Sequence, residues 1–206
     1  MKDDLDLFLN NLTPKEKQAL AYAKRVHEGV YRKGKKNEEY IWHPIRVAFL
    51  VNKYKRSKAI EDLICAAFLH DTVEDTKDDK NMMYSDIIDM FGERVGSLVR
   101  ELTSVEEYKN EVGKAKDLGV KLRGMSNWAL VIKLCDRLDN ISDLDNVQDE
   151  FKERYINETI HVMHTLLSNR NGRTVSNTNL VIISDILDKI LSYGEKNIIK
   201  EKTIKR

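Results

Sequence analysis

The chain has 206 residues, of which 41% are hydrophobic and 33% charged, a balance that is typical of a folded globular protein and excludes a largely disordered one. With 35 Lys and Arg against 34 Asp and Glu, the formal net charge of +1 gives no overall basic excess for binding nucleic acid or an anionic membrane. No apolar run reaches the ~20 residues of a membrane span, and the first residues contain no apolar h-region, so we expect no secretory signal. The isolated Cys65 and Cys135 make no disulfide framework, so we expect a cytoplasmic protein.

Helix signals begin near the N-terminus and continue along the chain, whereas two prolines and nine glycines leave too few turns for an all-β fold. Thr13, Pro14 and Glu16 form a capping box that predicts a helix to about Gly29. The other predicted helices are 44–54 from Pro44, 59–69 after the cap Ser57, 85–92 from the cap Ser85, 93–102, 126–144 from the cap Ser126, 151–167 and 178–193. The sequence therefore predicts an all-α, single-domain bundle of about eight helices over residues 1–206, with C-terminal helices at about 150–195 and a basic tail at 196–206.

Two segments, Tyr31–Tyr40 and Thr103–Gly124, lack strong periodicity and are rich in Lys, Arg and Glu. Loops of this length in a compact domain are usually either mobile or functional. The first segment carries four cations, among them Arg32 and Lys33. By itself such a loop is an ordinary solvated surface, but its local positive field also suits a ligand with several phosphates.

The predicted helix over residues 59–69 runs into titratable side chains. Its apolar stripe, at i, i+3, i+4 and i+7, continues at the same spacing into His70, Asp71 and Glu74. Burying an imidazole and two carboxylates costs free energy unless they pair with each other or bind a metal. We therefore interpret this cluster as functional.

Two further stretches place titratable groups beside apolar ones. In the predicted helix 126–144, a polar face at i+3 and i+4 spacing, which alone would be a solvated face, is formed by Lys133, Asp136, Asn140 and Asp143. His43 lies among bulky apolar residues at the start of another predicted helix, where its ring can be held rigidly.

His43, His70, Asp71 and Asp136 together offer two imidazoles and two carboxylates. Imidazole suits Mn, Fe, Co, Ni or Zn, and carboxylate shifts the preference toward harder ions. An ion held by this set can lower the pKa of a bound water and polarise a phosphorus centre. Glu74, one turn beyond His70, can reach such a water as a base without being a ligand.

These motifs stand in a fixed order along the chain: Arg32-Lys33, Tyr40–Ala48, Ala66–Thr76 and Val131–Asn140, with Phe91–Val95 and Leu98–Thr103 between them. The pattern His…His-Asp…Asp resembles the signature of the HD phosphohydrolase superfamily. From about Leu20 to Leu144 the chain resembles one branch of it, the hydrolase domain of RelA/SpoT homologues.

The resemblance implies an HD-type bundle that hydrolyses the 3′-pyrophosphate of the alarmones ppGpp and pppGpp with a water on one Mn²⁺, leaving GDP or GTP and pyrophosphate. Carried over by position, the metal ligands would be His43, His70, Asp71 and Asp136. Glu74 and Asp75 would position and activate the water, Arg32 and Lys33 would hold the purine and nucleotide, and Asn140 the ribose.

The chain departs from the family pattern at three points. The family usually has His or Tyr where this chain has Asp139, and an extra carboxylate beside a polyanion is unfavourable, so substrate preference is affected. Phe68 replaces a more common Leu. At 206 residues the chain is expected to be a small, stand-alone hydrolase without synthetase and regulatory domains.

The remaining histidines have weaker patterns. His161 and His164 share a helix face at i, i+3, but no carboxylate pattern accompanies them, so we do not expect a metal there. His27 is expected to have a structural role near Arg32.

Two alternatives stay open beside the alarmone hydrolase. One is another nucleotide phosphohydrolase, acting on the 2′-phosphate of NADPH or on dNTPs, and the other is a nucleotide-binding module without catalysis. In each case the expected partner is a small nucleotide, with no nucleic acid and no membrane, and the sequence sets no oligomeric state.

Overall fold

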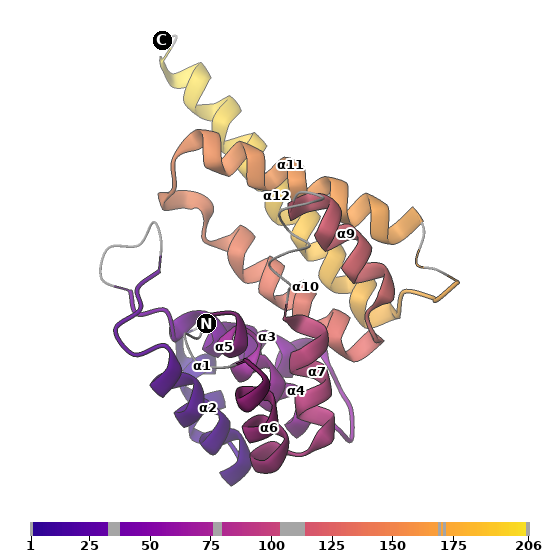
Figure 1. Cartoon of the computed structure of the whole chain (residues 1–206). Helices are drawn as coiled ribbons and strands as arrows, with labels where there is room; N and C mark the ends of the chain where they lie inside the picture. The colour runs from indigo at the N-terminus through magenta and orange to yellow at the C-terminus, as the bar shows by residue number, and fades with distance from the viewer. Residues whose placement is uncertain are drawn as a thin grey trace.

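The computed structural model describes residues 2–32, 38–75, 80–103, 114–168, 170 and 172–204 (Figure 1). Within these ranges the regular structure is helical, and the β-type pairing is confined to an isolated antiparallel bridge between Tyr31 and Glu39. The prediction of an all-α fold is therefore confirmed.

The helices, in chain order, are α1 (Lys2–Asn10), α2 (Pro14–Val26), α3 (Trp42–Tyr54), α4 (Ile60–Leu69), α5 (Thr72–Asp75), α6 (Lys80–Phe91), α7 (Glu93–Leu102), α9 (Lys114–Gly124), α10 (Asn127–Ser142), the 3₁₀ turn η1 (Leu144–Asn146), α11 (Asp149–Ser168) and α12 (Asn177–Ile204). The described ranges thus hold more helices than the eight that were predicted. The additional helices are α1, α5 and α9.

Helix α4 is the centre of the N-terminal group, and α2, α3 and α7 pack around it. All of its residues from Leu63 to Leu69 are buried. A helix that is apolar on every side is stable only when other elements enclose it. The end of α4, where the predicted ligands His70 and Asp71 follow, is therefore held firmly inside the protein.

Helix α10 joins the two halves of the molecule. It packs against α3 and α7 on one side and against α12 on the other, and Figure 1 shows α9, α11 and α12 gathered beyond it. The buried apolar side chains form one continuous cluster from Phe8 in α1 to Tyr193 in α12. The single domain over residues 1–206 stays a prediction, and this continuous core supports it.

Two of the four predicted helix caps are confirmed, and two are wrong. Thr13 accepts from the backbone N–H of Glu16, and the Glu16 carboxylate accepts from the backbone N–H of Thr13, which makes the full capping box. Ser126 caps α10 by accepting from the backbone N–H of Ala129. Ser85, by contrast, lies inside α6, which begins five residues earlier at Lys80. Ser57 is not the cap of α4, because the N-cap residue of that helix is Ala59, with no side-chain cap hydrogen bond.

Several predicted boundaries also need correction. α3 begins at Trp42, so Pro44 occupies its first turn, where a missing N–H breaks no helical hydrogen bond. The expected loop 103–124 contains α9, and the expected tail 196–206 continues α12 as far as Ile204. No described helix has both the length and the apolar run that crossing a bilayer would require.

Candidate metal centre

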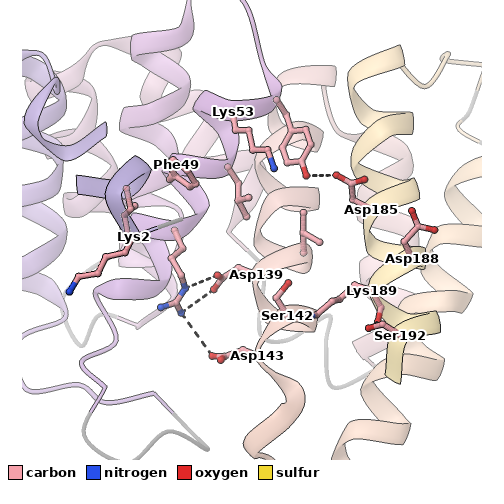
Figure 2. A pocket seen from close by; sticks show the side chains of 15 residues that line it. Lys2, Phe49, Lys53, Asp139, Ser142, Asp143, Asp185, Asp188, Lys189 and Ser192 are labelled. Carbon is pink, nitrogen blue, oxygen red and sulfur yellow. Dashed lines mark hydrogen bonds and ion pairs between the residues drawn. The ribbon is translucent and has the colours of Figure 1, made fainter. Parts of the chain in front are cut away.

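A pocket of about 800 Å³ opens between α1, α3, α10 and α12 (Figure 2). Its walls include apolar side chains such as Phe49 and Leu138, and at one end it reaches Arg46, Asp139 and Asp143. None of the four predicted metal ligands lines this pocket. The predicted ligands lie instead in a polar network that is continuous with Arg46, Asp139 and Asp143.

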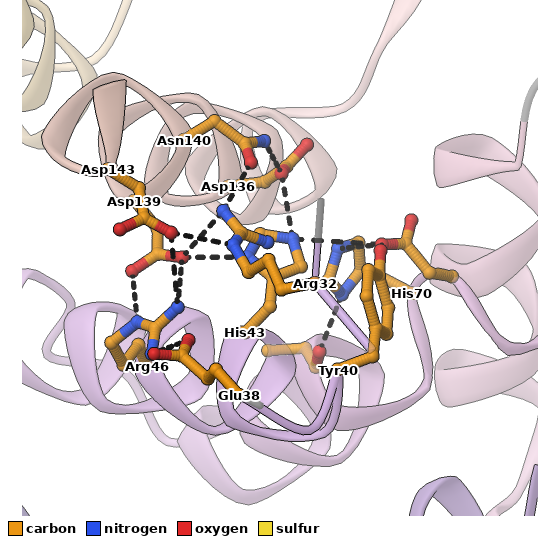
Figure 3. A network of polar contacts seen from close by, with 12 residues as sticks. Arg32, Glu38, Tyr40, His43, Arg46, His70, Asp136, Asp139, Asn140 and Asp143 are labelled. Atoms are coloured by element: carbon orange, nitrogen blue, oxygen red, sulfur yellow. Dashed lines mark hydrogen bonds and ion pairs between the residues drawn. The ribbon is translucent and has the colours of Figure 1, made fainter. Parts of the chain in front are cut away.

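The four predicted ligands are brought together from three parts of the fold, and Figure 3 labels three of them, His43, His70 and Asp136. His43 comes from the first turn of α3, His70 and Asp71 from the turn between α4 and α5, and Asp136 from α10. One donor atom each from His43, His70 and Asp71 lie within 4.8 Å of one another. The carboxylate of Asp136 joins them through its Oδ1, which is 3.2 Å from Nε2 of His43.

The His70 ring is oriented by its own helix. α4 ends at Leu69, where the helix was predicted to end, and the chain turns before α5, so the helical spacing that led from Ile60 to Glu74 is interrupted after Leu69. The Nδ1–H of His70 donates to the carbonyl of Ala67 at 2.8 Å, so in the neutral ring the lone pair is on Nε2, where a metal would bind. This Nε2 is fully buried and makes no hydrogen bond within the described residues, although it lies 3.0 Å from Oδ2 of Asp71.

The His43 ring is oriented in the same way by a different group. Its Nδ1 lies 2.7 Å from Oδ2 of Asp139 and donates to that carboxylate, which turns Nε2 toward Asp136 and Asp71. Histidines that ligate metals usually donate their other ring N–H to a carboxylate or carbonyl in this manner. Both imidazoles are therefore prepared as ligands.

The donor spacing fits a single ion. Nε2 of His70 and of His43 lie 3.0 Å and 3.7 Å from Oδ2 of Asp71. With bonds of ~2.1 Å at right angles, neighbouring ligand atoms around one metal are ~3.0 Å apart. Nitrogen and carboxylate oxygen donors at this spacing can hold a divalent metal ion.

The carboxylates are supported as well. The hydroxyl of Tyr40 donates to Oδ2 of Asp71 at 2.6 Å. Asn140 donates its side-chain N–H to Oδ1 of Asp136 at 2.6 Å, and the ammonium of Lys133 lies 2.8 Å from Oδ2 of the same carboxylate. Each acid thus has one preferred orientation.

The charges of the cluster compensate one another strongly. Burial lowers the pKa of His70, but Asp71 and Asp136 outweigh it and raise that pKa to about 9. Burial likewise opposes the ionisation of Asp71, yet the neighbouring His70 holds the pKa of this carboxyl well below its usual range. Lys133 does the same for the pKa of Asp136. Protons thus balance the acids in the absence of a metal, and a divalent cation would displace them on binding.

The predicted catalytic acids lie on α5. Glu74 is half-buried, and it is the weakest of the three acids that raise the pKa of Lys133, after Asp136 and Asp71. The backbone of Asp75 ends the same short helix, and its side chain lies outside what the structure describes. Glu74 follows the His70-Asp71 turn closely, as the spacing indicates.

The predicted nucleotide residues meet at α10. Arg32 donates from Nε to Asp143 at 2.7 Å and from Nη2 to the side-chain oxygen of Asn140 at 2.7 Å. The backbone of Arg32 pairs with that of Glu38 across the loop, which holds the guanidinium over α10. Lys33 lies outside the described residues.

The expected effect of Asp139 needs correction. Its carboxylate does not face the site as an unpaired charge, because it is buried between Arg46 and His43. Oδ1 and Oδ2 accept from Nε and Nη2 of Arg46 at 2.7 Å and 3.2 Å. The negative charge is therefore compensated inside the protein.

Sequence reasoning missed the support provided by Tyr40 and Arg46, whereas it places Asp143 on the polar face of the predicted helix 126–144. Of the two that were missed, Arg46 could have been noticed, since it lies three residues after His43 on one helix face. His27 is buried with its ring centre 4.9 Å from that of Tyr40, and burial lowers its pKa to about 4, so it is a neutral packing residue.

The exposed pair His161 and His164 on α11 belongs to no potential metal cluster in the described part of the chain.

Comparisons with known proteins converge on one family. The sequence pattern of the HD domain family matches residues 19–174. The guanosine-3′,5′-bis(diphosphate) 3′-pyrophosphohydrolase of Aquifex aeolicus is 30% identical over 177 residues, which cover 84% of this chain and 24% of that protein. MESH1 of Drosophila melanogaster, which carries the same enzyme name, is 33% identical over 128 residues, which cover 62% of this chain and 68% of MESH1.

A solved structure described as a metazoan ortholog of SpoT that hydrolyzes ppGpp superposes with a TM-score of 0.69 at 26% identity, covering 86% of this chain and 96% of that one. The bifunctional (p)ppGpp synthase/hydrolase SpoT of Escherichia coli is 29% identical over 161 residues. This chain spans 22% of its length and 24% of the Aquifex protein.

Proposed function

Because this chain belongs to the HD domain family, we propose that it hydrolyses ppGpp and pppGpp, releasing the 3′-pyrophosphate and leaving GDP or GTP. The observation that carries the proposal is the paired arrangement of His43 and His70. Each ring donates from Nδ1 to an acceptor and turns Nε2 toward Asp71, in a chain whose relatives are named for this reaction.

The ion that we propose is one Mn²⁺, held by His43, His70, Asp71 and Asp136. Two imidazoles with two carboxylates suit a divalent ion between the soft and hard extremes, and the two acids balance its charge. Such an ion supplies Lewis-acid chemistry, lowering the pKa of a bound water and polarising a phosphoryl oxygen.

The remaining steps fall to side chains of the chain itself. The oxygen of water bonds to the phosphorus attached to O3′, the bond between that phosphorus and O3′ breaks, and O3′ takes up a proton. Glu74 accepts the proton that the water loses, with Asp75 beside it to position the water. Lys133 keeps Asp136 in place during this exchange, since it contacts the carboxylate oxygen that Asn140 leaves open.

The nucleotide is assigned to the loop and α10. Arg32 can stack flat on a purine, Lys33 adds a charge for the phosphates, and Asn140 reaches the ribose. Arg32 is paired with Asp143, Asn140 and Asp139, so nucleotide binding would exchange these contacts for new ones. Cys65 and Cys135 are buried free thiols, which supports the cytoplasmic location that we propose for the reaction.

The test is a substrate comparison on EDTA-treated protein, with and without added Mn²⁺, followed by ³¹P NMR. We expect ppGpp to give GDP and intact pyrophosphate only when metal is present, with NADPH and dNTPs turned over far more slowly. Orthophosphate from NADPH as the main product would replace this proposal with a phosphomonoesterase. Binding of ppGpp to metal-loaded protein without turnover would indicate a nucleotide-binding module.

A further inference from the structure

Asp139 is a buried carboxylate at the edge of the candidate centre, and the proposed reaction gives it no role. Its side chain lies on α10, one helical turn beyond Asp136, and the residue is 5% exposed. Oδ2 accepts from the His43 ring, from Arg46 and, at 3.4 Å, from Arg32, whereas Oδ1 accepts from Arg46 alone. Burying a charged carboxylate costs free energy, so we asked what the contacts of Asp139 contribute to the centre.

Arg46 prevents the Asp139 carboxylate from rotating. Two nitrogens of its planar guanidinium contact the two carboxylate oxygens, which is the bidentate geometry that fixes an acid in one plane. Arg46 is itself fixed from behind, because its Nη1 donates to Glu38 at 2.8 Å. The order Glu38, Arg46, Asp139, His43 is therefore a rigid chain of contacts that ends on Nδ1 of the imidazole (Figure 3).

The polarity of the helices explains why His43 needs a distant partner. His70 follows the last turn of α4, where backbone carbonyls are left open, and Ala67 supplies one of them. His43 lies in the first turn of α3, where the open backbone groups are N–H donors. An imidazole that must donate from Nδ1 finds no open carbonyl there, so its acceptor has to come from another element.

We propose that Asp139, held by Arg46, is a positioning residue that fixes His43 in the tautomer whose Nε2 lone pair faces the divalent ion. The inference rests on the proposed metal centre, but it does not require that ppGpp be the substrate. Outer partners of this kind typically change metal affinity by ~10- to 100-fold when they are removed.

The decisive variant is Asp139→Asn, compared with Asp62→Asn as the matched control. Asp62 is also a carboxylate bridged by two cations, Lys15 at 2.5 Å and Arg94 at 2.7 Å, but it lies outside the metal centre. We expect the dissociation constant for Mn²⁺, measured by calorimetry without nucleotide, to rise ~10- to 100-fold in Asp139→Asn and to stay within twofold in Asp62→Asn.

A second measurement separates positioning from general stability. In Zn²⁺-loaded protein, ¹⁵N shifts of the His43 ring should show the proton on Nδ1 in the wild type and a loss of that single state in Asp139→Asn. A role limited to fold stability would lower the melting temperature of the metal-free protein while leaving the Mn²⁺ affinity and the ring tautomer unchanged, and that result would overturn the proposal.

Arg46→Lys keeps the proposal testable if Asp139→Asn does not fold. Lysine retains the positive charge beside Asp139 but cannot hold both of its oxygens, so we expect a smaller rise in the Mn²⁺ dissociation constant, ~3- to 10-fold. Unchanged affinity in a folded Arg46→Lys protein would contradict the rigid chain of contacts. Because metal binding is measured without nucleotide, failure to hydrolyse ppGpp would refute the proposed function alone.

Discussion

The two histidines of the candidate centre have the same orientation, but different kinds of group fix it. We call His70 with Asp71 and the carbonyl of Ala67 the His70 corner, and His43 with Asp139 the His43 corner. At the His70 corner the acceptor for Nδ1 is a backbone carbonyl three residues earlier, and the next residue is itself a predicted ligand. At the His43 corner the acceptor is a side chain 96 residues later, on a helix that must first pack against α3. The first corner is contained in one short motif, whereas the second exists only in the folded chain.

This difference predicts how each corner responds to substitution. A backbone carbonyl cannot be replaced by mutation, so the His70 corner can be broken only at its ligands. The His43 corner can be disturbed through side chains that never touch the metal. The following predictions run from the largest expected effect to the smallest.

Replacing the ligand His70 should abolish metal binding. His70→Ala removes a ligand whose Nε2 has no other hydrogen bond in the described residues, so we expect metal content near zero and ppGpp turnover at background. The fold should survive, because α4 keeps its buried residues Leu63–Leu69. Metal analysis, circular dichroism and a turnover assay check this together. Undiminished turnover by metal-free wild-type protein would contradict metal dependence altogether.

Glu74→Gln distinguishes metal binding from catalysis on the His70 side of the centre. Glu74 follows the ligand pair on α5 but is assigned to the water, so its amide variant should retain stoichiometric metal and bind ppGpp normally. We expect kcat to fall by ~10²-fold or more, the scale of a lost general base. If metal content fell in parallel with kcat, Glu74 would be a ligand.

Arg32→Lys tests nucleotide binding at the site that Arg32 forms with residues of α10, which lie far from it in the sequence. The substitution keeps the charge but loses the planar contact with a purine and the fork that now meets Asp143 and Asn140. We expect KM for ppGpp to rise ~10-fold, equivalent to one charge-assisted hydrogen bond, with metal content unchanged. Steady-state kinetics at two salt concentrations measure this, and an unchanged KM would remove Arg32 from the nucleotide site.

The last prediction concerns stability and not activity: the contribution of His70 to the stability of the metal-free protein should depend on pH. The pKa of His70 is raised to about 9 by its acidic neighbours, so the folded protein binds this proton more tightly than the unfolded chain does. The resulting stability is fully present below the unfolded value of ~6.5 and is lost as the pH rises through about 9. Melting temperatures of metal-free wild type and His70→Asn should therefore converge between pH 6.5 and 9. The control, His164→Asn, alters an exposed histidine and should show no such convergence.

The elements that could be predicted are those specified within a few residues. The capping box at Thr13, the cap at Ser126 and the titratable end of α4 each depend on neighbours along one helix, so their chemistry was visible in the sequence. α9 was missed because Lys114–Gly124 has too little apolar periodicity to stand out.

The role of Asp139 could not be predicted for a different reason. The i, i+3 spacing of His43 with Arg46 and of Asp136 with Asp139 was visible on each helix. That these two faces meet depends on how α3 packs against α10, which no local pattern encodes. A carboxylate expected to disturb a polyanion therefore turned out to be neutralised by an arginine from the facing helix.

The pocket between α1, α3, α10 and α12 bears on inhibitor selectivity. Chelating compounds act on metal enzymes in general, and nucleotide mimics compete with abundant cellular nucleotides. A compound that filled these roughly 800 Å³ would do neither, because the residues that line the pocket include none of the four predicted metal ligands and neither Arg32 nor Asn140. It would instead contact Arg46 and Asp139 from their pocket side. Its discrimination among related enzymes would then depend on position 139, where this chain carries an acid in place of the usual His or Tyr.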